Sequence, residues 1–409
     1  MLTGIPEKQN PEARRGWKNA GFVDRWPFIY NDLHKRDYVT VFSEDEHGAG
    51  TFHLRLKGFR KEPTTYYPRP MWVAMRSHVA RQMSCPHQFN MIYMRDFFDA
   101  NRDYNKFAIV FNALIHNKID RLENGDDDLI NFFTQLDESE HANNTVVFFM
   151  GDHGLRTSTF RSTLQGKLEE RLPMLAIKLP PKLQAYKKEL QNLKRNALVL
   201  TSHFDLYSTF QHLATFPHAN PADHGRKYGR SLFSDIAELN RSCSDAGVDN
   251  HWCTCLNYHK VDVSNDKYVD RFVTKVVQFI NERNIHIVPG KCQVLKLMRI
   301  TQAGRRTPNA EVNQFKGTKT RWGQCDSCSV QYDKKKKFTR FMYEVNFVVS
   351  PSNAEYEASG EVVTKADGET EINIDTHISR TNLYGNQPQC IFSEFPHLRA
   401  YCFCKDQGS

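Results

Sequence analysis

Long hydrophobic runs are missing from this chain of 409 residues. The longest apolar stretches, residues 107–110 and 145–150, fall far short of the roughly 18 apolar residues that a membrane-spanning helix needs. Residues 1–8 also lack the apolar core of a secretory signal peptide. No membrane span is therefore expected, and no signal peptide is recognised in this sequence.

Charge of one sign is only modestly in excess. The 55 lysines and arginines outnumber the 47 acidic residues, which gives a net charge of +8. Part of this excess is the lysine run 334–337, which has neither an aromatic stacking platform nor a nucleic-acid motif around it. A solvated loop is favoured there over a nucleic-acid or heparin patch, so no nucleic-acid partner is expected.

Cysteine is almost absent from the first half of the chain, where Cys85 stands alone. The other cysteines lie between Cys243 and Cys404, a crowding that indicates either disulfides or a zinc module. Only Cys325 and Cys328 have the spacing typical of paired zinc ligands. Disulfides are therefore favoured, although spacing does not fix which cysteines pair.

Disulfides need an oxidising compartment, so this interpretation predicts an extracellular protein. Two glycosylation sequons, beginning at Asn143 and Asn240, are compatible with secretion and with a glycoprotein. The missing signal peptide conflicts with that prediction.

Strand-like and helix-like segments alternate over residues 1–240, which we expect to form the first domain. This alternation predicts an α/β fold with a mostly parallel sheet and helices on both faces. Ser202 and Asp205 resemble a capping box at the start of a helix, with Asp in place of the usual Glu. Strands are expected at 38–42, 107–111, 145–150 and 174–179, and helices at 89–100, 127–136, 183–193 and 202–214.

The sequence changes character after about residue 240. Residues 241–290 predict a cysteine-bearing connector and an amphipathic helix at 266–283. Residues 291–409 predict a small antiparallel sandwich closed by disulfides. Its strands are expected at 293–300, 341–349, 360–364 and 371–378.

The most informative motif is Gly151-Asp152-His153-Gly154, directly after the buried strand expected at 145–150. A carboxylate beside an imidazole offers an oxygen and a nitrogen to one metal ion, and the imidazole favours zinc over calcium. The glycines permit a tight turn and the close approach of a ligand. Taken alone, the motif also fits an ordinary turn capped by Asp152.

Two other strands end in similar groups. Glu44 and Asp45 follow the first strand, and His116 follows the second. Because parallel strands present their carboxyl ends at one edge of a sheet, we expect these groups to converge with Asp152 and His153. Each acid or histidine alone also fits an ordinary loop residue.

Basic residues follow the metal-binding motif. Arg156 and Lys167 lie within the stretch after His153. Arginine and lysine beside a metal suit an anionic tetrahedral ester, either a phosphate or a sulfate. Either residue alone also fits a solvated surface charge. The prediction of an anion-binding metal site therefore depends on the acids, histidines and basic residues occurring together, not on any one of them.

The motif and its basic neighbours resemble the alkaline-phosphatase and sulfatase superfamily, and more closely its extracellular animal branch called domain of unknown function 229. The resemblance covers nearly the whole chain. It implies a three-layer α/β/α fold with a mostly parallel sheet and a small, disulfide-rich, mainly β C-terminal domain. The segments that carry it are 38–40, 44–46, 58–60, 63–70, 143–156, 165–173, 204–209, 229–233, 251–255, 378–380 and 401–404.

The resemblance also implies roles for individual residues. Asp152 and His153 match the metal pair of the superfamily, His116 an active-site histidine, and Lys167 the lysine that contacts the transferred group. Arg156 is then a further group that stabilises charge on the ester oxygens. Glu44 and Asp45 occupy a segment that carries Lys and His in sulfatases, so the sequence departs from the pattern there.

Family members also have an earlier strand that ends in an Asp ligand, followed by a Ser, Thr or Cys nucleophile. Residues 1–4 resemble a point beyond that segment, so we expect a shortened chain that has lost it together with the signal peptide. The expected function is that of an extracellular, ancestrally metal-dependent phospho- or sulfo-ester hydrolase with impaired activity. The alternative is a secreted, catalytically inactive scaffold used for binding.

Overall fold

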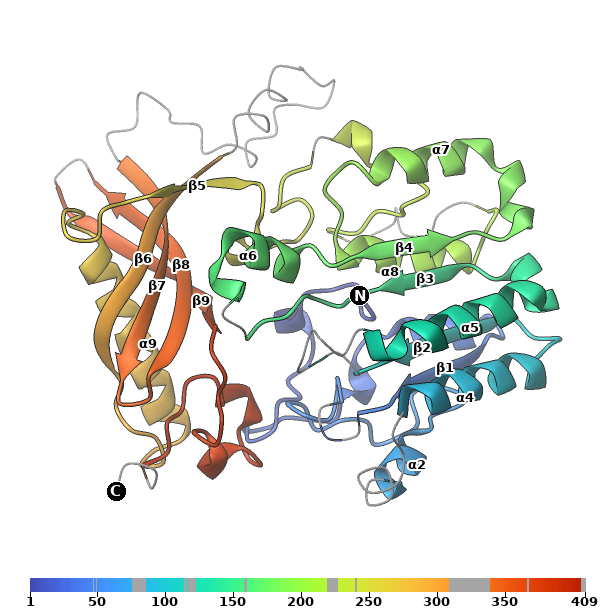
Figure 1. The fold of residues 1–409 in the computed structure, drawn as a ribbon, viewed down its shortest axis with the longest axis horizontal. Coiled ribbons are helices and arrows are strands. Elements are labelled where there is room, and N and C mark those ends of the chain that lie inside the picture. The colour runs from blue at the N-terminus through green and yellow to red at the C-terminus, as the bar shows by residue number, and fades with distance from the viewer. Residues whose placement is uncertain are drawn as a thin grey trace. The chain divides into compact units, whose positions relative to one another are not determined.

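The computed structural model describes residues 1–46, 48, 50–75, 86–113, 116, 123–157, 160–218, 227–239, 241–308, 339–365 and 368–405. The chain forms two compact units (Figure 1). The first comprises residues 1–151 and 174–238, and the second comprises residues 152–173 and 239–409. Among the described helices, none has the length and apolar character needed to cross a bilayer.

Four strands form two separate pairs in the first unit. Strands β1 (Val39–Glu44) and β2 (Lys106–Phe111) pair in parallel, with Glu44 opposite Phe111. Strands β3 (Val147–Met150) and β4 (Leu175–Lys178) pair antiparallel. The predicted positions of these strands are confirmed. Among the described strands of this unit, β1 and β2 form the parallel pairing, whereas β4 begins at Leu175, beside the end of β3 at Met150, and runs antiparallel to it.

Helices cover both faces of these strands. Helix α4 packs Met94 and Phe97 against Val41 of β1, and helix α8 lies on the opposite side in the larger core. The ring of Phe210 contacts Phe107 of β2 at 5.5 Å and Phe148 of β3 at 5.1 Å, between ring centroids. The helices of this unit are α1 (Ile29–His34), α2 (Arg69–Ala74), α4 (Pro86–Ala100), α5 (Asp126–Glu138), α7 (Lys187–Asn196) and α8 (His203–Leu213), with 3-10 turns η1 (Glu7–Gln9), η2 (Val23–Arg25), η4 (Glu140–Asn144), η6 (Pro181–Ala185) and η8 (Ala237–Leu239).

The capping box predicted for α8 is present. The Asp205 carboxylate accepts a hydrogen bond from the backbone N–H of Ser202 at 2.7 Å. Its second oxygen accepts the N–H of Arg230 at 2.8 Å, and Asp205 is completely buried. One carboxylate therefore starts the helix and fixes the loop that follows it.

The second unit contains one antiparallel sheet with strand order β5-β6-β7-β8-β9. Helix α9 (Val269–Ile287) lays its apolar stripe on the sheet, with Phe272, Val276 and Ile280 in the core. Among the described residues of this unit the predicted sandwich is not seen, because α9 covers the sheet where a second sheet was expected. The strands are β5 (Leu256–Lys260), β6 (Lys296–Pro308), β7 (Thr339–Ser350), β8 (Ala354–Thr364) and β9 (Thr370–Arg380), and α6 (Leu164–Arg171) also belongs here, with η5 (Phe160–Ser162), η9 (Asn250–Trp252), η11 (Gln389–Ile391) and η12 (Pro396–Leu398).

Disulfides are present in this unit, as the crowding of cysteines predicted. They join Cys243 to Cys253, Cys292 to Cys402, and Cys390 to Cys404. Cys402 and Cys404 are buried in a small core with Val288, Ile391 and Leu398. The cross-links therefore fasten the C-terminal segment to the end of α9. Cys85, Cys325, Cys328 and the lysine run 334–337 lie outside the described residues.

Candidate functional site

The Gly-Asp-His-Gly turn begins where β3 ends. The Asp152 side chain is 51% exposed and that of His153 is 31% exposed. Oδ2 of Asp152 lies 3.4 Å from Nε2 of His153, and Oδ1 accepts the backbone N–H of His153 at 2.9 Å. The two side chains therefore present an oxygen and a nitrogen together, at a solvent-accessible position.

The hydrogen bonds of His153 define its tautomer. Nδ1 lies 2.7 Å from the carbonyl oxygen of Gly154, and a carbonyl only accepts, so Nδ1 carries the proton. Nε2 meets a guanidinium nitrogen of Arg156, which only donates. The lone pair therefore lies on Nε2, where it accepts a hydrogen bond from Arg156. A ring held by an Nδ1–H bond to a carbonyl is the arrangement that metal-binding histidines use.

Gly154 is packed against helix α6. Its N–H donates to the carbonyl oxygen of Glu170 at 3.0 Å. A Cβ atom at Gly154 would meet the carbonyl oxygen of Glu169 at 2.3 Å, which is too close for any side chain. The second glycine of the motif is therefore required by the approach of α6, which fixes the turn that carries Asp152 and His153.

Helix α6 begins where Thr163 caps it by accepting the N–H of Gly166 at 3.0 Å. The Lys167 ammonium contacts the Glu344 carboxylate and lies 2.9 Å from Oε2 of Glu357. Lys167 thus forms ion pairs with two buried carboxylates on β7 and β8.

Two arginines extend this charged network. Arg161 pairs with Glu170 and lies 3.2 Å from Glu357, while Arg171 contacts Glu357 as well. Burial alone would raise the pKa of Glu357, but Lys167, Arg171 and Arg161 outweigh burial and hold that pKa well below its ordinary value. Glu357 is therefore ionised and fully buried among three cations.

Glu44, Asp45 and His116 belong to the first unit. Oδ1 of Asp45 accepts the N–H of Ala113 at 2.9 Å, and Oε1 of Glu44 accepts the N–H of Thr51 at 2.7 Å. Burial raises the pKa of Asp45 to about 6 and also raises that of Glu44. His116 is exposed, and its N–H donates to the carbonyl oxygen of Ala113 at 3.0 Å.

These contacts place Glu44, Asp45 and His116 at the carboxyl ends of the parallel pair β1–β2. Asp45 ties its own strand to the segment that leads to His116. The two acids act here as acceptors for backbone N–H groups, which keeps the loops after β1 and β2 in place.

Cysteines supply the largest ligand clusters in the described part of the chain. The groups of three or more closely spaced potential ligands there are Cys243 with Cys253 and Cys255, and Cys390 with Cys402 and Cys404. Each group contains a disulfide, which removes two thiolates from metal binding. Asp152 and His153 do not belong to a group of three or more potential metal ligands among the described residues, so they offer two ligands to a metal ion.

Glu344 and Glu357 are functional neighbours of Lys167 that were not predicted from the sequence. Both are charged residues inside strand-like runs of apolar residues, in Phe-Met-Tyr-Glu-Val and Glu-Tyr-Glu-Ala-Ser. A buried acid in a strand requires a cationic partner. The positions of these two glutamates in the sequence therefore indicate that a lysine or an arginine packs against the strands. The identity of the partners depended on the tertiary fold.

The model of one protein family matches residues 1–301, and this family is described as Protein of unknown function (DUF229). The match spans most of the chain, so the protein belongs to the DUF229 family. No curated protein and no solved structure matches the sequence.

Proposed function

We propose that this protein binds a divalent metal through Asp152 and His153, on a scaffold related to alkaline phosphatases and sulfatases. The observation that carries the proposal is the placement of Asp152 Oδ2 and His153 Nε2, 3.4 Å apart on side chains that are 51% and 31% exposed. The tautomer of His153 leaves Nε2 able to bind the ion. The proposed three-layer fold is supported by helices on both faces of the strands of the first unit.

The donor set fits zinc better than calcium. A neutral imidazole is a common zinc ligand, whereas calcium takes oxygen ligands. Bound there, the ion would act as a Lewis acid toward an ester oxygen. Arg156 already lies against His153, where its guanidinium could pair with an anionic phosphate or sulfate ester.

The network around Lys167 favours impaired hydrolysis. In the related enzymes the corresponding lysine is expected to contact the transferred group. Here its ammonium is bound by Glu344 and Glu357, and both carboxylates are buried. An ester would have to replace charge-assisted contacts that the protein itself supplies. We therefore also propose the second candidate, a catalytically inactive scaffold that binds through the retained metal pair.

An extracellular location is part of the proposal. Three disulfides in the described residues support it, since such bonds persist in oxidising compartments. Asn143, the first residue of a sequon, is exposed, as attachment of a glycan requires.

Zinc titration of the oxidised protein tests the metal site. Asp152→Asn and His153→Gln should each weaken zinc binding by at least about tenfold, because each removes one of two ligands. The matched control is Asp270→Asn, which changes an exposed acid on α9 and should leave the affinity unchanged. Equal zinc affinity in all four proteins would refute the site.

Activity assays distinguish the two candidate functions. The wild-type protein is incubated with zinc and an aryl phosphate or an aryl sulfate. A hydrolysis rate that falls in Asp152→Asn would identify a hydrolase. Zinc binding without hydrolysis above that of Asp152→Asn would identify the inactive scaffold.

A further inference from the structure

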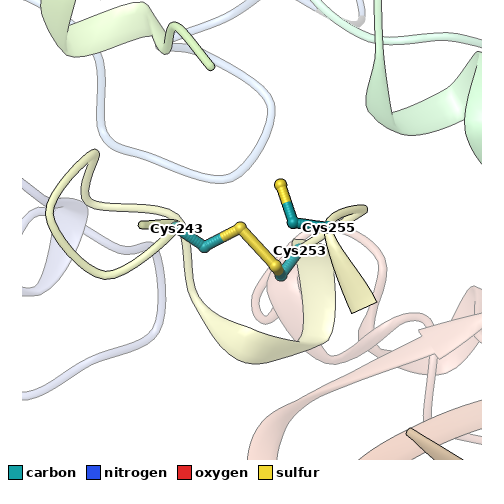
Figure 2. A group of neighbouring side chains, drawn as sticks. All are labelled: Cys243, Cys253 and Cys255. Carbon is teal, nitrogen blue, oxygen red and sulfur yellow. A yellow bond between two sulfur atoms is a disulfide. The ribbon is translucent and has the colours of Figure 1, made fainter. Parts of the chain in front are cut away.

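Three sulfur atoms lie together in the second unit, where the chain enters strand β5 (Figure 2). Cys243 and Cys253 form a disulfide, while Cys255 has no disulfide partner among the described residues. The Sγ atoms of all three lie within 4.8 Å of one another. The cluster thus holds a thiol next to a disulfide, which is a nucleophile next to its electrophile.

We propose that Cys243, Cys253 and Cys255 form a thiol–disulfide exchange site. The Cys255 thiol gives its proton to solvent, and the resulting thiolate attacks Sγ of Cys243. The new sulfur–sulfur bond joins Cys255 to Cys243, while the electron pair of the old bond leaves with Cys253, whose thiolate takes up a proton. One disulfide and one thiol are present before and after the step, so it needs neither an oxidant nor a reductant.

Chain geometry selects Cys243 as the atom attacked. Cys255 follows Cys253 by only two residues, with Thr254 between them. A disulfide between these two cysteines would close a very short loop, which restricts the Cα separation and the side-chain angles that a disulfide requires. Cys243 comes from another segment, so a bond from it to Cys255 is free of that restriction.

Exchange would change how the loop is fastened to the sheet. Cys253 follows η9, where the buried His251 contacts the hydroxyl groups of Ser359 at 3.1 Å and Ser379 at 2.9 Å. Cys255 directly precedes β5. Moving the bond from Cys253 to Cys255 shifts the tether of Cys243 from η9 to the start of β5. The unit thus has two covalent forms.

Burial makes the exchange an internal reaction. Cys243 and Cys253 are buried and Cys255 is half-buried, which hinders attack by the thiol of another protein. Burial also raises the pKa of the Cys255 thiol, so little thiolate is present at neutral pH. Exchange should therefore be slow near neutral pH. As long as the pH stays below that pKa, each increase of one pH unit should raise the exchange rate by about tenfold, because the thiolate fraction rises by that factor.

Disulfide mapping tests the proposal in the full-length oxidised protein. Samples are held without added thiol at increasing pH and quenched in acid, then alkylated and digested under acidic conditions for mass spectrometry. We expect the label on Cys255 and, in a fraction that grows with time and pH, on Cys253. Label on Cys255 alone at every pH would overturn the proposal, as would a bond from Cys255 to any cysteine other than Cys243 or zinc held by three reduced thiols.

Two variants control the experiment. Cys253→Ser removes the present partner of Cys243, and we expect a Cys243–Cys255 disulfide in its place. Two unpaired thiols in this variant, with its melting temperature close to that of the wild type, would contradict exchange. Cys255→Ser should retain the Cys243–Cys253 bond and show no label on Cys253 at any pH.

Discussion

At the scale of single residues, the proposed metal site depends on a hydrogen bond rather than on sequence identity alone. The bond from His153 Nδ1 to the Gly154 carbonyl, 2.7 Å long, leaves the lone pair on Nε2. The Arg156 guanidinium occupies that lone pair in this structure. Arg156 is thus both a candidate partner for an anionic ester and a competitor of the metal.

Replacing Arg156 tests this competition. Arg156→Gln removes a positive charge beside the ligands, so we expect zinc affinity to rise by about fivefold, equivalent to about 1 kcal/mol. Arg271→Gln, on the exposed side of α9, is the control and should change nothing. A lower zinc affinity in Arg156→Gln would mean that this arginine supports the metal site instead.

Asp45 gives a pH-dependent prediction. Burial raises its pKa from 3.8 to about 6, so the folded state holds the proton more tightly than the unfolded state. As the pH rises from about 4 to about 6, ionisation of Asp45 therefore costs stability, up to about 3 kcal/mol. Asp45→Asn keeps an acceptor for the Ala113 N–H and should melt higher than the wild type at pH 7.5, with no gain at pH 3.5. An equal difference at both values would contradict this account.

At the scale of elements, α6 connects the turn of Asp152 and His153, the proposed metal site, to the antiparallel sheet. Gly154 bonds to the carbonyl oxygen of Glu170 near the end of the helix, and Lys167 in its middle pairs with Glu357 on β8. Charged groups therefore fix α6 to β7 and β8, where a helix more often relies on an apolar face. The position of the turn that carries Asp152 and His153 therefore depends on the stability of these ion pairs.

Removing Glu357 should loosen α6. Glu357→Gln leaves Arg161, Arg171 and the partly buried Lys167 without their shared carboxylate, and we expect a loss of about 3–5 kcal/mol in the free energy of unfolding, measured with urea. Glu355→Gln, exposed on the same strand, should cost less than about 0.5 kcal/mol. Equal stability of the two variants would contradict a role for the network.

The pH profile of the same pair gives a second readout. Glu357 has a depressed pKa, so its stabilising contribution is complete above its ordinary pKa of 4.5 and is lost as the pH falls through the lower value of the folded state. The difference in stability between Glu357→Gln and the wild type should therefore shrink below pH 4.5 and stay constant above it.

At the scale of the whole molecule, much of the element order was predictable and the pairing was not. The periodicity of apolar residues located β1 to β4, α8 and α9, because burial imposes it on local sequence. The antiparallel pairing of β4 with β3 depends on long-range contacts, which local periodicity does not encode. The same holds for the packing of α9 on the sheet of the second unit. Similarly, Asp152 and His153 were recognisable as a motif, whereas the network around Lys167 joins residues that are far apart in the sequence.

Residues 152–173 interrupt the first unit in the sequence. They lie between β3 and β4 in sequence, yet they belong to the second unit with residues 239–409. The family match ends at residue 301, within β6, so the partners Glu344 and Glu357 lie beyond it. The turn of Asp152 and His153, the proposed metal site, therefore lies within the family match but is supported by residues outside it.

The position of the bound metal tests the central claim most directly. Crystals of the oxidised protein grown with zinc would be measured at the zinc absorption edge. The account predicts an anomalous peak bonded to a carboxylate oxygen of Asp152 and to Nε2 of His153, with the Arg156 guanidinium displaced from that nitrogen. A zinc peak confined to cysteine sulfur atoms, or no zinc at Asp152 and His153 at saturating metal, would contradict it.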